Sequence, residues 1–453
     1  MVKSTQRGTA SSGPMSKPTS AHVPRQVSAP SESRTADLVV VGLGHVGLPL
    51  ARSACAAGLR VRGLDVSDRV TSGLGAGRSH VGGVTDAEVA SMLAQDFRAG
   101  TDPEVVRDAR TVVICVPTGL VADGGPDLAQ VEAATGEVAR RLTPGTLVVL
   151  ESTSYPGTTE QVVKPLLEKG SGLVAGQDFF LAYSPQRIDP GNREWGVGNT
   201  PKIVSGYTTH CARRAVAFYS PFIRDVVLAK GTREAEMAKL LENTYRYVNI
   251  ALVDEVALYC RLSGIDVWDV LHCAGTKPFG FGRFAPGPGV GGHCIPVDPR
   301  YLATEAERQG YSFRLLDAAR QVLDSMPGHV AQRALGVLDD HGIEPEGARV
   351  LLLGVTYKPD VADIRETPAR AVAAVLAESG VQVSYHDPYV EHFRVGGVTL
   401  PRATDLDKAL DTADLVVLLQ LHTCYDLGAL GRRGRPLLDT RGTVVTGRFV
   451  TPL

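Results

Sequence analysis

The sequence predicts an α/β protein with two doubly wound, Rossmann-like domains joined by a long central helix. Two separate series of apolar runs alternate with helical patterns, one starting near residue 36 and one near residue 349. Between them, an uninterrupted helical pattern runs from residue 232 to about residue 263. We therefore expect a tail at 1–35, a first Rossmann domain at 36–210, a helical central domain with a cysteine loop at 211–335 and a second Rossmann-like domain at 336–453.

The composition is that of an ordinary globular protein. The 453 residues have a formal net charge of -2 and an apolar share of 43%, so neither nucleic acid nor an anionic membrane is an expected partner. Residues 1–35 are rich in Ser, Pro, Thr and Gly and lack an apolar run, which predicts a disordered tail and not a signal peptide. No stretch reaches the roughly 20 apolar residues of a membrane span.

The seven cysteines are scattered along the chain and never form a C-x-x-C pair. This distribution is typical of reduced thiols in a cytoplasmic protein, and it gives no zinc-binding pattern. We therefore expect a cytoplasmic location and no metal site.

The first apolar run, residues 37–41, leads into a glycine-rich turn. Gly42, Gly44 and Gly47 form a G-x-G-x-x-G pattern with a strand before it and a helix after it. The second strand ends at Asp65, whose carboxylate would accept hydrogen bonds from a ribose diol and repel a 2′-phosphate. This favours NAD over NADP; a helix-capping aspartate in an unrelated α/β fold is the alternative. The expected cofactor contacts also include His45, Val46 and Arg69.

Two further strands of this unit end in residues that are suited to meet a ligand. The runs at 111–116 and 147–150 are almost continuously apolar, as buried parallel strands require. Ligands on such sheets gather at the carboxyl ends of the strands. We expect cofactor or substrate contacts from the residues at these ends, although each threonine could simply cap the next helix: Pro117, Thr118, Glu151 and Thr153.

The central helical pattern is too long for the flank of one small domain. At 1.5 Å per residue, some 30 residues span about 45 Å, which favours a spine between domains or across a dimer. Lys239 and Asn243 are four residues apart and therefore share one face of this helix. Periodicity alone does not distinguish Lys239 from an ordinary solvated lysine.

One cysteine lies in a segment rich in conformationally special residues. Residues 286–298 contain four glycines and three prolines, with Cys294 beside His293 and four residues before Asp298. Glycine lets backbone amides approach a ligand, and proline restricts the path between them. A thiol held among such amides can act as a nucleophile. The alternative is a buried loop with an inert cysteine.

The C-terminal third repeats the alternation of strands and helices. Apolar runs at 349–354, 381–385 and 415–419 indicate a second doubly wound domain. Because the cysteine segment lies between two nucleotide-type domains, we expect one domain to hold the cofactor and the other a nucleotide-linked substrate.

Several motifs occur in a fixed order along the chain: 42–49, 115–118, 151–153, 184–187, 236–239 with Asn243, 286–298, 354–360 and 363–365. Over residues of about 36 to 450, the chain resembles the nucleotide-sugar 6-dehydrogenases of the UDP-glucose/GDP-mannose dehydrogenase family. Residues 277–281 resemble the branch that acts on UDP-N-acetylglucosamine. The family implies a UDP-sugar as partner, and we expect the assembly to be a homodimer.

The resemblance implies oxidation of a sugar C6 alcohol to a carboxylate with two NAD. Cys294 would add to the aldehyde that forms first and carry a thioester after the second hydride transfer. Lys239, Asn243 and a water near Thr153 would steady the developing oxyanion. Asp298 would act as a general acid or base. The implied substrate contacts are Arg187, Lys277, Phe279, Gly291, Lys358 and Arg365.

Lys358 and Arg365 follow the first strand of the second domain. By resemblance they would contact the nucleotide end of the substrate or a neighbouring subunit, and two cations beside such a turn suit a diphosphate. The alternative for these two residues is a surface ion pair with Asp360 or Asp363.

Gln186 departs from the family pattern, which has a glutamate at this position. That glutamate is the expected base for thioester hydrolysis, and an amide cannot accept a proton at neutral pH. Gln186 is nevertheless counted in the predicted catalytic set because of its place in the motif. Smaller departures are His45 for a usual tyrosine, Gly119 for a usual proline and Asp254 for a usual asparagine.

Three functional readings follow from this substitution. The first is a working dehydrogenase that makes a UDP-hexosaminuronate through a relay that bypasses Gln186. The second is an oxidoreductase that stops at an aldehyde or thioester, or returns hydride to C6. The third is a nucleotide-sugar-binding protein without turnover. They predict two, fewer than two and no NADH per sugar, and UDP-glucose is the alternative substrate.

Overall fold

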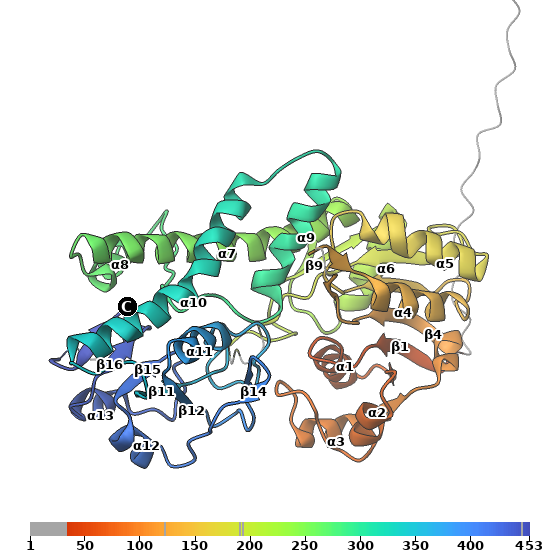
Figure 1. Ribbon diagram of the computed structural model, residues 1–453. Helices are drawn as coiled ribbons and strands as arrows, with labels where there is room; N and C mark the ends of the chain where they lie inside the picture. Colours follow the sequence, from red (N-terminus) through yellow and green to blue (C-terminus); the bar gives the residue numbers. More distant parts are fainter. Residues whose placement is uncertain (1–33, 122–123, 190–191, 193, 445–446) are drawn as a thin grey trace, which may run out of the picture.

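The computed structural model describes residues 34–453 apart from 122–123, 190–191, 193 and 445–446. Two sheet domains lie side by side, and a layer of long helices runs across both of them (Figure 1). This arrangement confirms the predicted fold class. Of the predicted tail, residues 1–33 lie outside the described residues. Arg34 already belongs to the fold, because its buried guanidinium donates to Thr146 Oγ1 at 2.7 Å and to the Pro144 carbonyl at 2.6 Å.

The first domain is built on an eight-stranded sheet of order β10-β9-β8-β7-β4-β1-β2-β3. All neighbouring strands are parallel except β8 and β9. The strands are β1 Ala36–Val41, β2 Val61–Leu64, β3 Arg98–Gly100, β4 Ala109–Ile114, β7 Leu147–Leu150, β8 Phe180–Tyr183, β9 Lys202–Gly206 and β10 Val226–Leu228. The strand order reverses between β1 and β4, which is where open α/β sheets bind their ligands.

Helices cover both faces of this sheet. They are α1 Gly47–Ala56, α2 Asp68–Gly75, α3 Asp86–Ala94, η1 Pro103–Asp108, α4 Ala129–Ala139, η2 Thr159–Val163, α5 Lys164–Ser171 and α6 Thr209–Tyr219. A hairpin of β5 Gly119–Leu120 and β6 Pro126–Asp127 follows β4. The sheet thus continues beyond residue 210, to the end of β10.

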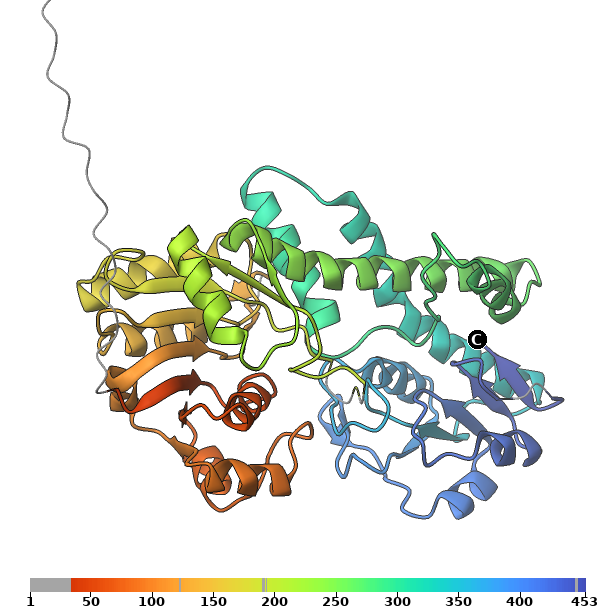
Figure 2. The same ribbon diagram turned by 180° about the vertical axis from the view of Figure 1, so that it is seen from behind.

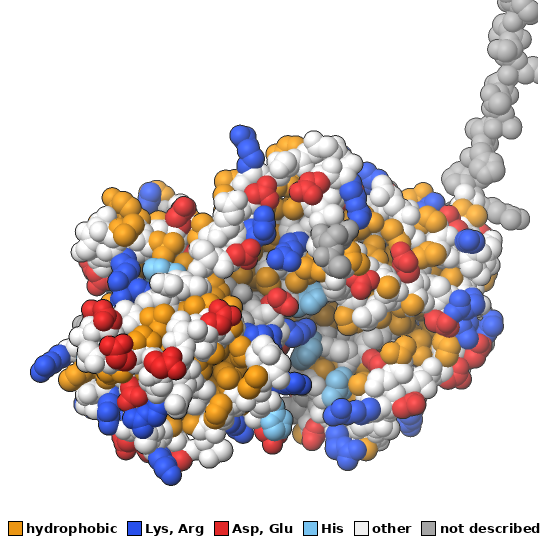
Figure 3. Space-filling model, viewed as in Figure 1, with side chains coloured by type: hydrophobic (Ala, Val, Ile, Leu, Met, Phe, Trp, Pro, Cys, Tyr) orange, Lys and Arg blue, Asp and Glu red, His pale blue; other side chains and the backbone are white. Residues whose placement is uncertain are grey.

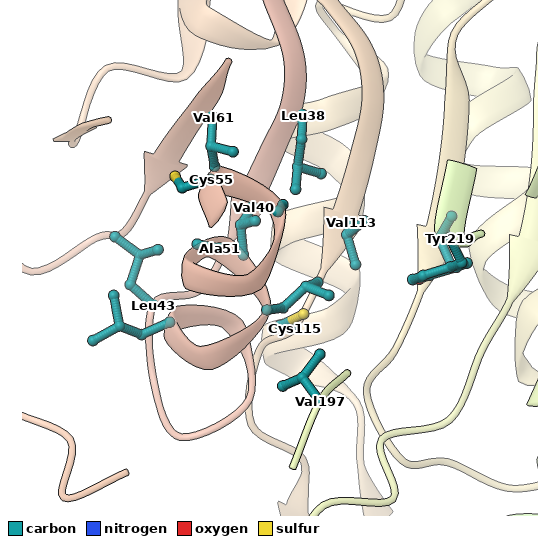
Figure 4. Close-up of a cluster of buried hydrophobic side chains, with 14 of the residues drawn as sticks. Leu38, Val40, Leu43, Ala51, Cys55, Val61, Val113, Cys115, Val197 and Tyr219 are labelled. Atoms are coloured by element: carbon teal, nitrogen blue, oxygen red, sulfur yellow. The ribbon is translucent and has the colours of Figure 1, made fainter. Parts of the chain in front are cut away.

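The core of the first domain explains why β1 forms at the centre of the sheet. Leu38 and Val40 face one hydrophobic cluster, whereas Val39 and Val41 face another on the opposite side. Figure 4 shows the first of these clusters, with α1 packed over Leu38 and Val40. Burial on both faces is typical of central parallel strands. Each such side chain contributes roughly 1.5–3 kcal/mol when it leaves water.

Four helices form the central layer. They are α7 Thr232–Leu262, α8 Val267–Gly275, α9 Cys294–Arg308 and α10 Arg314–Asp340. The 31 residues of α7 correspond to about 46 Å at 1.5 Å per residue, and the helix reaches across both sheet domains in the front and back views (Figures 1 and 2). Gly264 ends it with a left-handed φ of 67°. The predicted central spine is therefore present.

The C-terminal domain is a five-stranded parallel sheet of order β12-β11-β15-β16-β17. Its strands are β11 Arg349–Leu353, β12 Gln382–His386, β15 Leu415–Leu418, β16 Leu437–Asp439 and β17 Val450–Pro452, with the hairpin β13 Arg394–Val395 and β14 Val398–Thr399. Its helices are α11 Pro368–Glu378, α12 Leu406–Thr412 and α13 Leu427–Arg432. The second half of α10 packs into this core through Met326, Val330 and Val337, so α10 crosses residue 335.

Candidate active site

The glycine-rich turn after β1 has the shape of a dinucleotide site. Gly42 has a φ of 90°, and a Cβ on Gly47 would stand 1.9 Å from the Gly42 carbonyl oxygen, so neither position accepts a side chain. A Cβ on Gly44 would meet nothing within 4 Å, which leaves open space over the start of α1. Asp65 accepts the Leu43 N–H at 2.9 Å and thereby stands beside this turn. These residues fit NAD as the sequence predicts.

The C-terminal domain has a similar glycine turn and aspartate, but there the aspartate is already bound by another side chain. Gly354 ends β11 with a φ of 76°, and Asp387 after β12 accepts the Val355 N–H at 2.7 Å. Here, however, the buried His422 places Nε2 3.0 Å from Asp387 Oδ2. Because the Asp360 N–H donates to Nδ1 of His422, Nε2 carries the proton and donates to Asp387. The acid that would bind a ribose is occupied, so the dinucleotide belongs to the first domain.

Two packed helices bring the predicted catalytic residues together. Lys239 and Asn243 lie one turn apart on α7, and Cys294 and Asp298 lie one turn apart on α9. Asn243 Nδ2 donates to Asp298 Oδ2 at 2.5 Å. Lys239, Asn243 and Asp298 are buried, and Lys239 acts electrostatically on both Asp298 and Cys294. The structure thus gathers these four predicted residues into one cluster.

Burial sets the acid–base properties of this cluster. Desolvation raises the pKa of Asp298 to about 6, against the opposing effects of the Lys239 charge and the Asn243 hydrogen bond. Desolvation also raises the pKa of the Cys294 thiol, and Asp298 adds to this effect whereas Lys239 and Arg365 oppose it. Cys294 is nonetheless exposed to solvent. Asp298 therefore lies one turn after the Cys294 thiol, with a carboxyl pKa not far below neutral pH.

Cys294 is the first residue of α9, whereas the sequence suggested a turn. His293 is the N-cap position, and the glycines precede it. The positive end of the helix dipole consequently lies at the thiol and favours a thiolate there. Gly291 and Gly292 are required by close packing, since a Cβ on either would stand about 2.5 to 2.6 Å from Tyr357 of the C-terminal domain.

Residues at the ends of β4 and β7 approach α9 and α7. Thr118 is buried and Thr153 is half-buried, whereas Pro117 is exposed. Tyr301 of α9 donates its hydroxyl to the Gly119 carbonyl at 2.7 Å, which holds the segment after β4 against the helix that carries Cys294. No motif in the sequence singled out Tyr301.

Glu236 attaches the segment after β7 to the start of α7. Its fully buried carboxylate accepts N–H bonds from Gly157 at 2.5 Å and Thr159 at 2.8 Å, and the Thr159 hydroxyl at 2.6 Å. It lies one turn before Lys239, so it fixes the Thr153 segment relative to that lysine. Burial raises the pKa of Glu236 to about 7. The 236–239 motif contained this residue, but no role for it followed from the sequence.

Glu151, expected at the cofactor, takes part in a buried ion pair. Its Oε1 is 2.9 Å from Lys202 Nζ and accepts the Tyr219 hydroxyl at 2.5 Å. Only 2% of Glu151 is exposed. Its charge is therefore matched inside the first domain, at the carboxyl end of β7.

Gln186 and Arg187 are engaged by neighbouring protein groups. Gln186 Nε2 donates to the Ile188 carbonyl at 2.8 Å. Arg187 pairs with Glu242 of α7 at 2.7 Å and donates to the Pro201 carbonyl. The ion pair of Arg187 with Glu242 holds the 184–187 segment against α7.

The predicted diphosphate cations lie where the two sheet domains meet. Lys358 forms an ion pair with Asp189 of the first domain at 2.5 Å, and Arg365 pairs with Asp363 at 2.6 Å. Arg365 also lowers the pKa of His45, after the larger effect of burial, so the glycine-rich turn faces this segment. Figure 3 shows histidine and cationic side chains gathered in the hollow between the two lobes.

The other predicted contacts are farther from this hollow. Lys277 and Phe279 are exposed and stack on each other, with Nζ 5.0 Å from the ring centre. They follow α8, at the end of α7 away from the first domain (Figure 1). Within one chain the structure does not bring them to Cys294. Arg69 is likewise exposed, in the first turn of α2 after Asp65.

Comparison with protein families matches three consecutive domains of the UDP-glucose/GDP-mannose dehydrogenase family. The NAD binding domain matches residues 36–223, the central domain matches 233–324 and the UDP binding domain matches 351–446. The chain belongs to this family. It is an NAD-dependent oxidoreductase that acts on a UDP-sugar, with the cofactor in the first domain and the substrate's nucleotide in the last.

Known relatives share most of their length with this dehydrogenase. A UDP-N-acetyl-D-glucosamine 6-dehydrogenase of Pseudomonas aeruginosa is 38% identical over 356 residues, covering 78% of this chain and 83% of its own. A UDP-N-acetyl-D-mannosamine dehydrogenase of Pyrococcus horikoshii is 34% identical over 392 residues, covering 85% and 89%.

Solved structures agree with the sequence relatives. The structure of the UDP-D-ManNAc dehydrogenase from Pyrococcus horikoshii superposes with a TM-score of 0.83 at 31% identity, over 92% of this chain and 98% of that one. A UDP-glucose dehydrogenase from Pyrobaculum islandicum gives 0.81 at 27% identity, over 94% and 98%. Within the part of the chain that the structure describes, no helix is long and apolar enough to cross a membrane. No metal-binding group of three His, Cys, Asp or Glu side chains occurs in that part either.

Proposed function

We propose that this dehydrogenase oxidises the C6 alcohol of UDP-N-acetylglucosamine, or of a closely related UDP-N-acetylhexosamine, to the uronate. The observation that carries the proposal is the α7–α9 contact. It places a nucleophilic thiol, a buried acid, an amide and a lysine in one cluster, Cys294, Asp298, Asn243 and Lys239. A thiol at the start of a helix, one turn from a buried carboxylate, suits covalent chemistry, which argues against the reading as a non-catalytic binding protein.

The first oxidation requires groups that stabilise the negative charge that develops on the C6 oxygen. Bound NAD supplies the hydride acceptor for both oxidations, one NAD molecule after another. As C6 loses hydride, its hydroxyl proton must leave, and the charge on the oxygen is stabilised by the Lys239 ammonium and the Asn243 amide. The product is an aldehyde that remains bound to the enzyme. Thr153 is expected to hold a water at the same oxygen.

The second oxidation uses the thiol of Cys294. The thiol passes its proton to a base, and sulfur adds to the aldehyde carbon to form a thiohemiacetal. Loss of the second hydride from that carbon, together with loss of the hydroxyl proton to water, gives a thioester. Water then attacks the thioester, releases the carboxylate and returns the thiol. The sum is one alcohol, two NAD and one water converted to one carboxylate, two NADH and protons.

Asp298 is the group that supports hydrolysis in the absence of a glutamate at position 186. Its Oδ1 is buried and has no hydrogen-bond partner among the described residues, whereas Oδ2 is bound by Asn243. With a pKa of about 6, Asp298 is mostly ionised at neutral pH and can accept a proton from water. The competing reading is an altered outcome in which the reaction stops at the aldehyde or thioester, or hydride returns to C6, because Gln186 cannot serve as the base.

Preference for an N-acetylated sugar rests on resemblance. The Pseudomonas aeruginosa relative is named for UDP-N-acetyl-D-glucosamine and the Pyrococcus horikoshii relative for UDP-N-acetyl-D-mannosamine. Residues 277–281 resemble the first of these branches. UDP-glucose remains the alternative substrate, and a relative of that name has the same fold.

We also propose that the enzyme is a homodimer that associates along α7. Large apolar side chains recur on the exposed part of this helix at spacings of three, four and seven residues: Leu241, Tyr245, Leu252, Tyr259 and Leu262. Each is more than half exposed in the single chain, and contiguous exposed apolar surface is typical of an interface. A two-fold contact along α7 would place the exposed residues 277–283 of one copy beside the other copy, so Lys277 and Phe279 could influence the substrate site of the partner.

A panel of UDP-sugars tests the proposed activity directly. Purified enzyme would be incubated with NAD and with UDP-N-acetylglucosamine, UDP-N-acetylmannosamine or UDP-glucose, with NADH and product mass recorded. We expect uronate formation and a kcat/KM for an acetamido sugar at least tenfold above that for UDP-glucose, about 1.4 kcal/mol in transition-state binding. A tenfold preference for UDP-glucose would reverse the substrate assignment, and no NADH with any sugar would support the binding-protein reading.

A further inference from the structure

We infer that Asp254 is a positioning residue that fixes the segment 287–298 along helix α7; the inference rests on the proposed function of Cys294. Two hydrogen bonds attach this segment to the helix. The Gly287 N–H donates to Asp254 Oδ1 at 2.9 Å, and Asn243 Nδ2 donates to Asp298 Oδ2 at 2.5 Å. Cys294 lies between the two attachment points.

The two hydrogen bonds are separated by the same number of residues on α7 and on the segment 287–298. Eleven residues separate Asn243 from Asp254, and eleven separate Gly287 from Asp298. On α7 this interval is close to three turns, a rise of about 16 Å, so both attachment residues share one face. Both are buried, and Asp254 completely. The rigid helix thereby sets the positions at which the catalytic segment begins and ends.

Gly287 is the point where the segment enters the protein interior. Residues 277–283 before it are exposed, whereas residues 286–288 are buried. A Cβ on Gly287 would stand 2.9 Å from a terminal nitrogen of Arg441. The Gly287 peptide therefore lies between the carboxylate of Asp254 and the guanidinium of Arg441.

Arg441 extends the attachment to the C-terminal domain. Its Nε donates to the Leu419 carbonyl at the end of β15, at 2.7 Å. The next residue, Gly442, has a φ of 63°, and a Cβ there would stand 2.1 Å from the Trp268 ring of α8. The contacts around Asp254, Gly287 and Arg441 thus connect α7, α8, the segment 287–298 and the sheet of the C-terminal domain.

Asp254 is poorly suited to a purely stabilising role. Its Oδ2 has no hydrogen-bond partner among the described residues. Burial raises the pKa of Asp254 to about 7, and the Gly287 hydrogen bond and the Arg441 charge only partly oppose this. A buried carboxylate that lacks partners costs stability. Its position here is explained by the hydrogen bond that it accepts from the Gly287 N–H, at the start of the segment that carries Cys294.

Loss of this bond should act on chemistry and not on NAD binding. Without it, no hydrogen bond among the described residues attaches the segment from 277 to Cys294 to α7, and the thiol is held less closely against Asn243 and Lys239. The glycine-rich turn of the first domain is untouched. We therefore expect a lower kcat with an unchanged KM for NAD.

The test compares Asp254→Ala with Asp254→Asn in the full-length enzyme. Asparagine keeps an oxygen that accepts the Gly287 N–H, whereas alanine does not. We expect Asp254→Ala to lower kcat at least tenfold and to speed amide hydrogen exchange of peptides spanning 284–294 at least tenfold, and Asp254→Asn to restore both. If the alanine variant does not fold, Asp254→Ser replaces it, because its short hydroxyl bonds back to its own helix and does not reach Gly287.

Asp426→Ala is the matched control. Asp426 accepts the Ala429 N–H at 2.9 Å as the N-cap of α13, so its loss also removes one carboxylate-to-amide bond but touches nothing near Cys294. It should leave kcat and exchange in 284–294 unchanged. Unchanged exchange or unchanged kcat in Asp254→Ala, or equal damage from asparagine and alanine, would overturn the inference. If no UDP-sugar is oxidised, the proposed function fails, and the exchange data still decide whether Asp254 fixes the segment.

Discussion

Asn243 donates to Asp298 across the contact between α7 and α9, with 2.5 Å between Nδ2 and Oδ2. This bond orients the carboxylate so that Oδ1 has no partner among the described residues and remains available to a proton. It also fixes the relative rotation of the two helices, and so the position of Cys294 one turn before Asp298. Removal of the amide would leave a buried carboxylate unpaired, at a cost of about 1–3 kcal/mol.

Asp65 predicts strong preference for NAD. Its carboxylate stands beside the glycine-rich turn through the Leu43 N–H, where it would accept the ribose hydroxyls of NAD and repel the 2′-phosphate of NADP. We expect Asp65→Ala to weaken NAD use and to reduce the ratio of kcat/KM for NAD over NADP at least tenfold. The exposed neighbour Asp68 provides the control variant, Asp68→Ala, which should leave the ratio unchanged. Comparable kcat/KM for both cofactors in the unmodified enzyme would contradict the assignment.

The burial of Asp254 predicts how stability depends on pH. Its pKa is raised to about 7 in the folded state, from about 4 in the unfolded chain, so its contribution is present below pH 4 and is lost as the pH rises through 7. Buried histidines with lowered pKa, such as His293 and His329, act in the opposite direction. The informative quantity is therefore the difference between Asp254→Asn and the unmodified protein.

Thermal and denaturant unfolding of both proteins at pH 5, 6, 7 and 8 provides that difference. The stability of Asp254→Asn relative to the unmodified protein should increase with pH across this range, by on the order of 2 to 4 kcal/mol. A difference that is constant with pH would mean that Asp254 titrates at an ordinary value.

The exposed apolar side chains of α7 predict that charged substitutions among them will dissociate the dimer. Leu252 and Tyr259 are 54% and 64% exposed in the single chain, and a glutamate at either position would be buried without a partner in a contact along α7. Light scattering should give a dimer for the unmodified protein and a monomer for Leu252→Glu with Tyr259→Glu. Val398→Glu, at an exposed apolar position on β14, should remain a dimer. A monomeric unmodified protein would exclude the proposed interface.

The fold followed from local patterns in the sequence, whereas the meeting of the two polar pairs followed from the family resemblance. Continuous apolar runs identified β1, β4, β7, β11 and β15, and the uninterrupted period from residue 232 identified α7. Spacing of four placed Lys239 with Asn243 and Cys294 with Asp298. What spacing did not show is that Cys294 begins a helix, because proline and glycine before a helix give the same pattern as a loop.

The long-range partners of charged residues could not be predicted. Lys202 neutralises Glu151, Glu242 binds Arg187 and Asp189 binds Lys358, and each pair joins residues that are far apart in the sequence. The occupied acid of the C-terminal domain could not be predicted for the same reason. His422 follows a different strand from Asp387, and only the fold brings the two side chains together. The hydrogen bond between Asp254 and Gly287 likewise depends on how the segment 287–298 folds back along α7.

Gln186 predicts a slow last step. General-base assistance typically raises a rate 10²–10⁴-fold, roughly 3 to 5 kcal/mol. Without a base at position 186, thioester hydrolysis should be slower than the steps before it, and a burst of NADH should be followed by a slow phase. Intact-mass spectra should then show a sugar-nucleotide adduct on the protein. Gln186→Glu should speed the slow phase. The new carboxylate must turn away from the Ile188 carbonyl that the amide now contacts.

Steady turnover without an adduct, and without any gain from Gln186→Glu, would show that another group supplies the base. Asp298 is then the candidate, and Asp298→Asn should create the slow phase that Gln186 did not.

The yield of NADH per sugar tests the central claim most directly. With UDP-N-acetylglucosamine limiting, the unmodified enzyme should produce two NADH and one uronate per sugar at completion. Cys294→Ala should form no uronate, although slow reversible hydride exchange at C6 can persist, and the exposed Cys273→Ala should behave as the unmodified enzyme. One NADH per sugar with free aldehyde, or unchanged uronate formation by Cys294→Ala, would contradict four-electron oxidation through a thioester on Cys294.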